Sequence, residues 1–283
     1  MQSFAGRVAV ITGAGSGMGR ALAVRLAAEG CHLSLADVNL EGLAESVRQA
    51  EAEAARFGHE IRCHQSRLDV IDADAFAAFA GAVIAQHGRV DLLFNNAGVA
   101  LTGPFERVSP EDFRWLMDIN FWGVVNGCRV FLPYLKQSPA AHIVNTSSVF
   151  GLISVPTQTA YHAAKFAVKG FTDLLRLELA ETSVRVSCVM PGGVKTGIVR
   201  SSRVALGDNQ GPTREEMAAR FERYAALTPL DAADEILQGV RRGAPRILVG
   251  RDAKFLALLV RLFPVRYFDV LTRFSRGPKV LQN

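Results

Sequence analysis

A tyrosine and a lysine one helical turn apart are the residues that most directly suggest chemistry. Tyr161 and Lys165 lie in residues 158–181, whose apolar spacing predicts a helix, so their side chains share one helix face. A free tyrosine has a pKa of about 10 and is a poor base at neutral pH. An ammonium group on the adjoining turn favours the phenolate and moves that pKa toward the working range. The pair therefore predicts a phenol that exchanges a proton with a substrate hydroxyl group.

A serine pair precedes the tyrosine at the end of a predicted strand. Residues 142–146 form a short apolar run, and Ser147 and Ser148 follow it. Ser148 stands 13 residues before Tyr161 and can hold a substrate oxygen beside the phenol. Because a lone tyrosine and lysine at this spacing are usually neighbours on a helix surface, the chemical interpretation depends on the whole set and its context.

A glycine-rich turn near the start of the chain predicts a phosphate site. An apolar run, residues 8–12, leads into the turn, and a helical pattern follows it. The glycines fit the spacing TGxxxGxG, and Met18 stands where the spacing GxGxxG would need a glycine. Glycine turns are often only structural, but a strand–turn–helix context places backbone N–H groups and a helix N-terminus at a pyrophosphate. The turn consists of Thr12, Gly13, Ala14, Gly15, Ser16, Gly17, Met18 and Gly19.

An acidic residue ends the second predicted strand. Asp37 closes residues 32–37 and stands 18 residues after Gly19. A carboxylate near this separation bonds the adenosine ribose hydroxyls of a dinucleotide and repels a 2′-phosphate. No arginine or lysine adjoins Asp37 or Gly17 to receive such a phosphate. The sequence therefore favours NAD over NADP. The positive nicotinamide ring of such a cofactor would act together with the Lys165 ammonium group to favour the Tyr161 phenolate. The alternatives are a more distant arginine that admits NADP, and an aspartate that only serves a surface turn.

Alternating strand and helix patterns must position these residues. The predicted strands are residues 8–12, 32–37, 60–65, 90–95, 142–146, 184–189 and 246–249. The predicted helices are residues 21–29, 40–57, 73–87, a segment beginning near Ser109, 158–181 and 231–242. Residues 196–228, which are polar and loop-like, and 251–283 depart from this rhythm. Repeated βα units predict a single α/β domain with one parallel sheet covered on both faces.

Charge and cysteine content exclude several classes of function. The net charge is +5, but ten lysines and arginines stand against two acids from Arg241 onward, which gives +8 there and −3 elsewhere. This predicts a local interaction surface and no nucleic-acid binding. The four cysteines form no CxxC or Cys/His cluster, so we expect no metal site and no disulfide. We see no signal-peptide pattern and no apolar run of about 18 residues, and we expect a cytoplasmic protein.

Together these segments resemble the short-chain dehydrogenase/reductase family over roughly residues 5–250. The matching segments are TGAGSGMG (12–19), Asp37, Asp69, NNAG (95–98), Asn120, HIVNTSS (142–148), YHAAK (161–165) and PGGVKT (191–196). The resemblance implies a Rossmann-type, doubly wound sheet of about seven strands, usually in a homotetramer or dimer. It also implies hydride transfer between a nicotinamide dinucleotide and a carbon–oxygen centre.

The resemblance further implies a role for each matching residue. Ser148, chosen over Ser147 by the 13-residue spacing, Tyr161 and Lys165 form the catalytic trio, and Asn120 anchors a water in a proton relay through Lys165. Asp69 with Val70 lies at the adenine, residues 96–98 line the adenosine ribose, and residues 191–196 line the nicotinamide amide and phosphates. The alternative for the asparagines of NNAG is that they bind no cofactor and only fix the backbone. The implied cofactor-binding residues are Gly13, Gly15, Ser16, Gly17, Met18, Gly19, Asp37, Asp69, Val70, Asn96, Ala97, Gly98, Tyr161, Lys165, Pro191, Gly192, Val194 and Thr196.

The substrate side is predicted to be apolar. In the family the segment after the PG motif covers the substrate, which makes residues 197–228 the lid of a catalytic domain spanning residues 1–250. The segments around the site offer no obvious cation for a carboxylate or phosphate, so we expect a hydrophobic secondary alcohol or its ketone, a bulky one included. Several of these residues are equally well explained as core. The predicted pocket residues are Val99, Phe150, Leu152, Val155, Gly193, Phe221 and Tyr224, the last two in an expected lid helix.

Residues 251–283 form an apolar and basic extension. Its stretch FLALLVRLFPVRYFDVLTRF (255–274) is amphipathic and interrupted by Pro264. We expect it to pack on a neighbouring subunit or over the pocket. The alternatives are contact with a membrane surface and an ordinary flank of the core.

The leading interpretation is an NAD(P)-dependent alcohol dehydrogenase or ketone reductase. A second is a reductase of carrier- or CoA-bound 3-ketoacyl chains, with the basic end docking an acidic carrier. Asp37 weighs against it, because reductive biosynthesis commonly uses NADPH. A third, of another class, is a dinucleotide-binding sensor or scaffold without catalysis. The intact set of Ser148, Tyr161 and Lys165 argues against that class, since a pure binder has no need of a tuned phenol.

Overall fold

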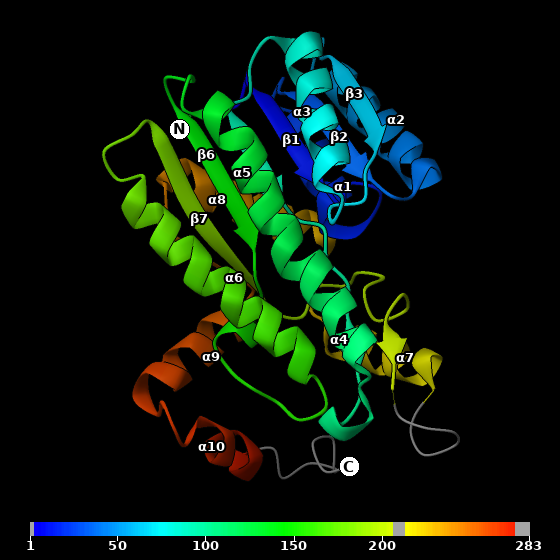
Figure 1. Ribbon diagram of the computed structural model, residues 1–283, viewed down its shortest axis with the longest axis vertical. Coiled ribbons are helices and arrows are strands. Elements are labelled where there is room, and N and C mark those ends of the chain that lie inside the picture. Colours follow the sequence, from blue (N-terminus) through cyan, green and yellow to red (C-terminus); the bar gives the residue numbers. More distant parts are fainter. Residues whose placement is uncertain (1–2, 206–212, 275–283) are drawn as a thin grey trace.

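The central element of the fold is one sheet of seven parallel strands. The computed structural model describes residues 3–205 and 213–274 (Figure 1). The strand order is β3-β2-β1-β4-β6-β7-β9, which confirms the predicted α/β class with a parallel sheet. The strands are β1 (Val8–Thr12), β2 (His32–Asp37), β3 (Cys63–Arg67), β4 (Leu92–Asn95), β6 (Ala141–Thr146), β7 (Val184–Pro191) and β9 (Arg246–Val249).

Helices cover both faces of the sheet and form two apolar cores with it (Figure 1). Ala9 and Ile11 of β1 belong to one core and Val10 to the other, because successive strand side chains point to opposite faces. The first core is closed by α1 (Gly17–Ala27), α2 (Leu40–Arg56) and α8 (Pro229–Arg242). The second is closed by α3 (Ala73–His87), α5 (Gly123–Leu135) and α6 (Thr159–Glu178).

Two element boundaries differ from prediction for identifiable reasons. Helix α1 begins at Gly17 rather than at residue 21, because its first turn faces the site and lacks the apolar spacing that marks a core-facing helix. Strand β3 covers Cys63–Arg67 rather than residues 60–65. Its residues are half-buried or exposed, as on the edge of a sheet, so no continuous apolar run marks it.

The helical region that begins near Ser109 consists of three parts. The Ser109 hydroxyl accepts a hydrogen bond from the Asp112 amide and caps α4 (Pro110–Met117), at the predicted start. A π-helical turn, Asp118–Trp122, follows and leads directly into α5. The sequence pattern did not reveal this division, because apolar spacing changes little across one π turn.

Residues 196–228 contain the helix expected around Phe221 and Tyr224 and, in addition, a short strand that was not predicted. Strand β8 (Arg203–Val204) pairs in parallel with β5 (Leu101–Thr102), and α7 (Arg214–Tyr224) starts at a capping box between Thr213 and Glu216. Residues 206–212 of the predicted lid lie outside the described residues. Backbone pairing between β8 and β5 therefore attaches the N-terminal part of the lid to the rest of the domain.

The extension forms two helices, α9 (Arg251–Leu262) and α10 (Tyr267–Phe274), at one edge of the molecule (Figure 1). Helix α9 follows β9 directly and contacts the 3₁₀ turn Val149–Gly151 that comes after Ser148. Within residues 3–205 and 213–274, no helix combines the length and the apolar character needed to cross a bilayer.

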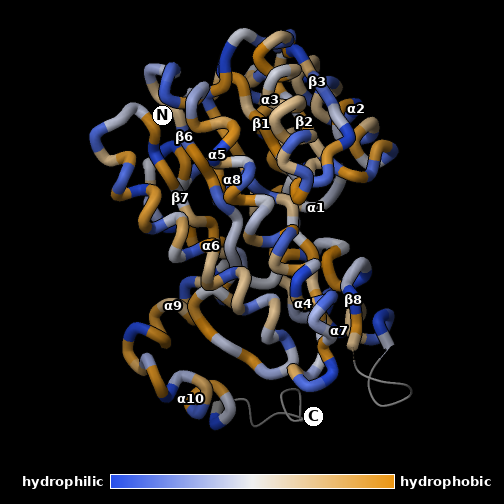
Figure 2. The backbone as a smooth tube through the Cα atoms, in the orientation of Figure 1, coloured by the Kyte–Doolittle hydropathy of each residue, from blue (hydrophilic) through white to orange (hydrophobic). Residues whose placement is uncertain are grey.

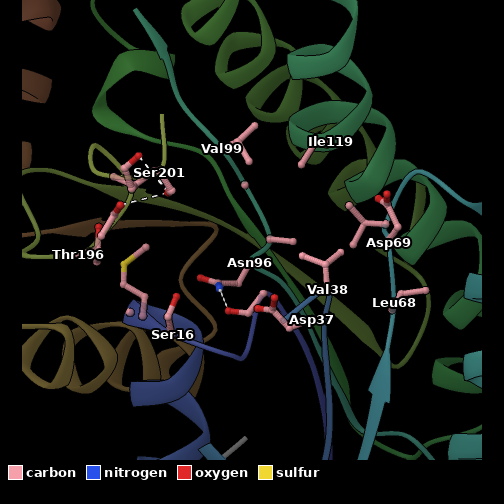
Figure 3. Close-up of a pocket in the computed structure, with 18 of the residues that line it drawn as sticks. Ser16, Asp37, Val38, Leu68, Asp69, Asn96, Val99, Ile119, Thr196 and Ser201 are labelled. Carbon is pink, nitrogen blue, oxygen red and sulfur yellow. Dashed lines mark hydrogen bonds between the residues drawn. The ribbon is translucent and has the colours of Figure 1, made fainter. Parts of the chain in front are cut away.

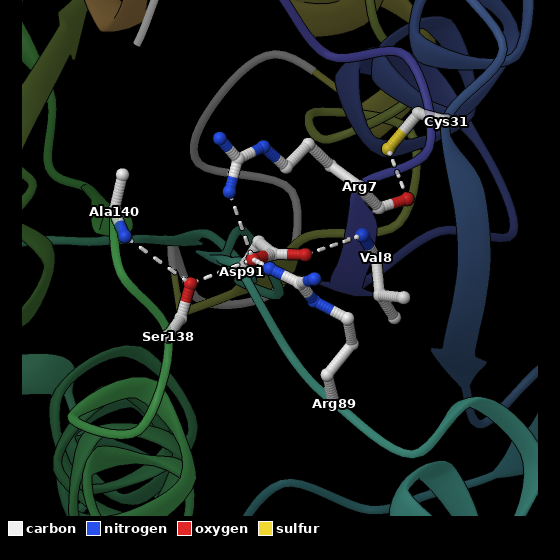
Figure 4. A network of polar contacts seen from close by, with 7 residues as sticks. All are labelled: Arg7, Val8, Cys31, Arg89, Asp91, Ser138 and Ala140. Carbon is white, nitrogen blue, oxygen red and sulfur yellow. Dashed lines mark hydrogen bonds and ion pairs between the residues drawn. The ribbon is translucent and has the colours of Figure 1, made fainter.

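A buried aspartate fixes the amino end of the central strands (Figure 4). The Asp91 carboxylate is fully buried and accepts hydrogen bonds from the Val8 amide at 3.0 Å and the Ser138 hydroxyl at 2.6 Å. It also pairs with Arg7 at 3.2 Å and with Arg89. Burial acts to raise the pKa of Asp91, but these hydrogen bonds hold it below its usual value. The network therefore ties β1, β4 and the segment before β6 together.

We predict that Asp91→Asn lowers the free energy of unfolding by about 2–4 kcal/mol, because it removes the charge that two arginines and two donors share. Asp234→Asn, which breaks the half-exposed pair with Arg25, is the control and costs under about 1 kcal/mol. Because the pKa of Asp91 is lowered in the folded state, its stabilisation persists above its ordinary pKa and disappears as pH falls through the lowered value. Urea denaturation measures both variants, and equal losses would contradict this account.

Candidate active site

A cavity of about 670 Å³ opens at the carboxyl ends of β1, β2 and β4 (Figure 3). This is the place where ligands bind to open parallel sheets, beside the strand at which the order reverses. The predicted residues Gly15, Gly19, Tyr161, Lys165, Pro191, Gly192 and Val194 do not line it. The lining residues are Gly13, Ser16, Gly17, Met18, Asp37, Val38, Leu68, Asp69, Val70, Asn96, Ala97, Gly98, Val99, Trp115, Ile119, Thr196, Gly197, Ile198 and Ser201.

The glycine turn brings backbone donors to this cavity. Gly13 has a φ of +64°, and a Cβ atom there would lie 2.7 Å from the Ala97 Cα. A Cβ at Gly19 would collide with the Gly13 carbonyl oxygen, so the turn and α1 pack backbone against backbone. Ser16 precedes the helix without a side-chain cap bond, which leaves the first-turn N–H groups for a ligand. These features fit a pyrophosphate group at the helix N-terminus.

Asp37 both lines the cavity and supports the turn. Its carboxylate accepts hydrogen bonds from the Gly15 amide and the Asn39 amide, each at 2.9 Å. The Arg20 guanidinium points instead to the Gly15 and Gly42 carbonyl oxygens and to Ser46. Among the residues that line the cavity there is no lysine or arginine.

The asparagines of NNAG hold backbone in place. The Asn96 side chain donates to the Thr12 and Gly13 carbonyl oxygens, both at 3.2 Å. Asn95 donates to the Asn145 side chain of β6 at 2.9 Å. Both asparagines therefore fix the strand ends that shape the cavity, which is the structural alternative drawn from the sequence.

One end of the cavity is an apolar slot next to Asp69. Val70 was expected there, whereas Val38, Leu68 and Ile119 were not. Val38 follows Asp37 and Leu68 precedes Asp69 in the sequence. Their position next to predicted site residues is the one sequence feature that could have identified them. Ile119 comes from the π turn and has no such signal. An apolar slot beside a carboxylate and a helix N-terminus fits a dinucleotide with its adenine in the slot.

The structure brings Ser148, Tyr161 and Lys165 together. The Ser148 hydroxyl lies at the Tyr161 phenol, where hydrogen bonding acts to lower the pKa of the phenol. The Lys165 Nζ lies over the Tyr161 ring, 5.5 Å from its centroid, and donates to the Thr146 carbonyl oxygen at 3.1 Å. Ser147 serves the backbone instead, since its hydroxyl donates to the Lys165 carbonyl oxygen. Ser148 is thus the serine at the phenol.

Burial is the main influence on the pKa values of the phenol and the ammonium group. Burial raises the pKa of Tyr161 to about 12, and the hydrogen bond with Ser148 acts in the opposite direction. Burial also lowers the pKa of Lys165 to about 8. The prediction that Lys165 and the positive nicotinamide ring together lower the pKa of Tyr161 concerns the protein with its dinucleotide bound, and it stays a prediction.

Asn120 positions the strand end beside the trio. It is fully buried in the π turn, where its Oδ1 accepts from the Val99 amide at 2.8 Å and its Nδ2 donates to the Val99 carbonyl at 2.9 Å. A Cβ atom at Gly98 would lie 3.1 Å from the Asn120 Oδ1 and 3.5 Å from the Lys165 Nζ. Asn120 and Lys165 therefore approach each other across Gly98, and the contacts of Asn120 are those of a positioning residue.

The loop after β7 reaches the cavity through Thr196. A Cβ atom at Gly17 would lie 3.3 Å from the Thr196 methyl group, so this loop lies directly across from the glycine turn. Asp252 of α9 holds the same loop, because its carboxylate accepts from the Gly193 amide at 2.6 Å. A Cβ at Gly192 would collide with that carboxylate, so the loop needs glycine there. No sequence pattern predicted a role for Asp252, because it lies 59 positions from Gly193.

The predicted substrate residues occupy different positions. Val99 lines the cavity. Phe150 lies edge-on to Tyr161, with ring centroids 6.2 Å apart, and stacks on His162 at 4.6 Å. Leu152 and Val155 follow on the same loop, where the Val155 amide donates to the His162 Nε2 at 3.1 Å.

The lid meets the cavity earlier than predicted. Phe221 and Tyr224 of α7 do not line the cavity, and Tyr224 is exposed. Ile198 and Ser201 line it instead, because the turn before β8 is the part of the lid that faces the site. Trp115 of α4 also lines the cavity.

Arg203 fastens the lid to this side of the cavity. Its guanidinium lies 3.7 Å from the Trp115 ring centroid and pairs with Asp112 at 2.7 Å. Its backbone amide donates to the Ala100 carbonyl at 3.0 Å. The lid is therefore held over the cavity by one side chain and by the pairing of β8 with β5.

Comparison with known proteins agrees with this geometry. Residues 7–206 match the family described as short chain dehydrogenase. A putative oxidoreductase, SadH, from Mycobacterium tuberculosis is 46% identical over 270 residues, 94% of each chain. Levodione reductase from Leifsonia aquatica is 37% identical over 212 residues, 75% of this chain and 78% of that one. A short chain dehydrogenase/reductase from Burkholderia phymatum in complex with NAD superimposes with a TM-score of 0.80 and 36% identity, covering 99% of this chain and 98% of that one.

The matched segment contains the glycine turn, the trio and the loop that carries Thr196. The identity to SadH extends over nearly the whole of both chains. The chain therefore belongs to the short-chain dehydrogenase/reductase family, oxidoreductases that act on CH–OH groups with a nicotinamide dinucleotide.

Proposed function

We propose that the chain interconverts a hydrophobic secondary alcohol, bulky ones included, and its ketone with NAD(H). The observation that carries this proposal is the position of the Lys165 ammonium group, 5.5 Å from the Tyr161 ring centroid, with Ser148 at the phenol. Phe150 forms an aromatic wall against the phenol, and Val99 adds an apolar one at the cavity. A relative named for reducing levodione supports the ketone–alcohol chemistry.

Each member of the trio has a defined task in this reaction. Ser148 donates a hydrogen bond to the substrate oxygen, and Tyr161 takes the hydroxyl proton in oxidation and returns it in reduction. Lys165, anchored to the Thr146 carbonyl, stabilises the phenolate. The bound nicotinamide supplies the acceptor or donor of the hydride, and its oxidised form adds a positive charge near the phenol. Asn120 holds the Val99 backbone, and with it Gly98, in place beside the position proposed for the substrate carbon.

The cavity favours NAD over NADP. Asp37 places a carboxylate at the end of β2, and the cavity lining contains no cation that could bind a 2′-phosphate. Arg20, the cation that follows the glycine turn in the sequence, is occupied by two carbonyl oxygens and Ser46. A carboxylate accepts hydrogen bonds from the ribose hydroxyls of NAD and repels the 2′-phosphate of NADP, so both effects favour NAD.

A second candidate is a reductase of CoA- or carrier-bound 3-ketoacyl chains. It is favoured by a cleft of about 830 Å³ that adjoins Thr196 and is lined in part by Lys195, Arg200 and Arg223. Arg200 pairs with Glu222 at 2.7 Å, so part of this charge is already balanced. The phosphates of such a carrier are anionic, and acetoacetyl-CoA belongs in the substrate panel for that reason.

We predict that Tyr161→Phe lowers kcat for every substrate by about 10²–10⁴-fold and leaves the dissociation constant for NADH within about twofold, because only the proton donor is lost. Initial rates on a panel of ketones of increasing size, followed by NADH absorbance, measure the first effect, and NADH fluorescence titration measures the second. Tyr134→Phe in α5 is the matched control and keeps full activity. Full activity in Tyr161→Phe would exclude the proposed chemistry, and an inactive wild type over the whole panel would point to a sensor or scaffold.

We predict that Asp37→Asn reduces the ratio of kcat/KM for NAD to that for NADP by about 10- to 100-fold, since it removes charged hydrogen bonds to the ribose and a repulsive charge. Asn retains one acceptor for the turn, so the fold is kept. Asp69→Asn at the adenine end is the control and changes both cofactors alike. A wild type that already prefers NADP, or an unchanged ratio in the variant, would overturn the assignment.

A further inference from the structure

Helix α9 has two apolar faces, of which only one packs on the protein. Ala253 and Leu259 are buried against the body. Phe255, Leu258 and Leu262 are 59%, 56% and 62% exposed. These three residues are spaced three and four apart and share a second helix face. A helix face that meets only water normally carries polar residues, so this one requires a separate explanation.

The exposed apolar surface continues beyond the helix. Phe263 and Val265, on either side of Pro264, are 44% and 87% exposed. We call Phe255, Leu258, Leu262, Phe263 and Val265 the C-terminal patch. Figure 2 shows hydrophobic residues along α9 and into α10, at the edge of the molecule away from β3 and α2. A cluster of this size on one rim exceeds the scattered apolar residues of ordinary surfaces.

Cations surround the C-terminal patch. Arg251, Arg261 and Arg266 are exposed, and none of them pairs with a carboxylate in the part of the chain that the structure describes. Lys254 is also exposed and pairs with Glu235 at 3.0 Å. Arg251, Lys254 and Arg261 thus lie on the same helix as the apolar residues of the patch, and Arg266 follows Val265 in the chain.

The acids of this region do not balance those cations. Asp252 is engaged with the Gly193 amide at 2.6 Å, so its carboxylate faces the loop after β7. Asp269 of α10 is the other acid among residues 251–274, and it is exposed. The surface around the C-terminal patch is accordingly positive.

We propose that the C-terminal patch binds the surface of a bilayer that contains anionic lipids. Apolar side chains flanked by arginines and lysines suit the boundary between acyl chains and headgroups, where the cations meet lipid phosphates. A second copy of the chain fits less well. A two-fold contact centred on the patch would pair it with itself and bring the same cations face to face.

The same two helices also touch the loops of the active site. Asp252 of α9 holds Gly193, and the Tyr267 hydroxyl of α10 accepts from the Ser154 amide at 2.8 Å. Ser154 belongs to the segment that follows Ser148 and Phe150. A lipid-bound patch therefore places the substrate side of the enzyme near the membrane, where a hydrophobic alcohol concentrates. This second point rests on the proposed function, whereas lipid binding itself does not.

The test is co-sedimentation of the full chain with vesicles of phosphatidylcholine alone and of phosphatidylcholine with phosphatidylglycerol in equal parts. We expect binding to the anionic vesicles only, and weaker binding as salt is added. Arg261→Gln with Arg266→Gln weakens partition about 25-fold, at about fivefold per lost charge. Leu258→Gln with Leu262→Gln abolishes it. Leu174→Gln with Leu177→Gln on α6, at 57% and 59% exposure, is the matched control and binds as the wild type does.

Light scattering on the same samples separates the competing occupants. The proposal is overturned if the wild-type protein binds neither kind of vesicle. It is also overturned if both patch variants still bind. An oligomer whose mass falls in Leu258→Gln with Leu262→Gln while wild type stays off the vesicles overturns it too, because the patch then contacts a second copy. Vesicle binding by a chain that oxidises and reduces no panel substrate leaves this inference standing and removes the proposed function, so the two fail separately.

Discussion

The site depends on a buried ammonium group next to a half-buried phenol. Burial disfavours the charged form of each group, which raises the pKa of Tyr161 to about 12 and lowers that of Lys165 to about 8. A phenolate is stable in such a place only beside positive charge, and Lys165 is the cation that the fold holds there. The Thr146 carbonyl and the Ser148 hydroxyl fix the two groups. The protein thereby keeps a phenol whose acidity responds to what binds beside it.

The surrounding elements serve to keep that pair next to a dinucleotide. The Asn120 amide, in the π turn, clamps Val99, and Gly98 leaves room between Asn120 and Lys165. Thr196 reaches the glycine turn from the other side, on a loop that α9 holds through Asp252. The C-terminal extension thus helps to position the active-site loops. It also carries an exposed apolar face.

Sequence reasoning succeeded where local rules decide the structure. Apolar runs and helical spacing predicted the seven strands and most helices, and the capped helix at Ser109 starts where the sequence predicts. It failed where contacts join distant segments. The Asp252–Gly193 and Ser154–Tyr267 bonds span 59 and 113 positions and leave no periodic trace. The burial that opposes the charged forms of Tyr161 and Lys165 is likewise a property of the packed fold and not of the YxxxK spacing.

The central claim is that Lys165 makes the phenol of Tyr161 ionisable when the dinucleotide is bound. The direct measurement is the pH profile of kcat in the oxidation direction for wild type and Lys165→Gln, with NADH affinity checked by fluorescence. The account predicts an apparent pKa for wild type well below the free-tyrosine value of about 10, and an upward shift with a lower plateau in the variant. The same apparent pKa in both proteins at equal NADH affinity would contradict it.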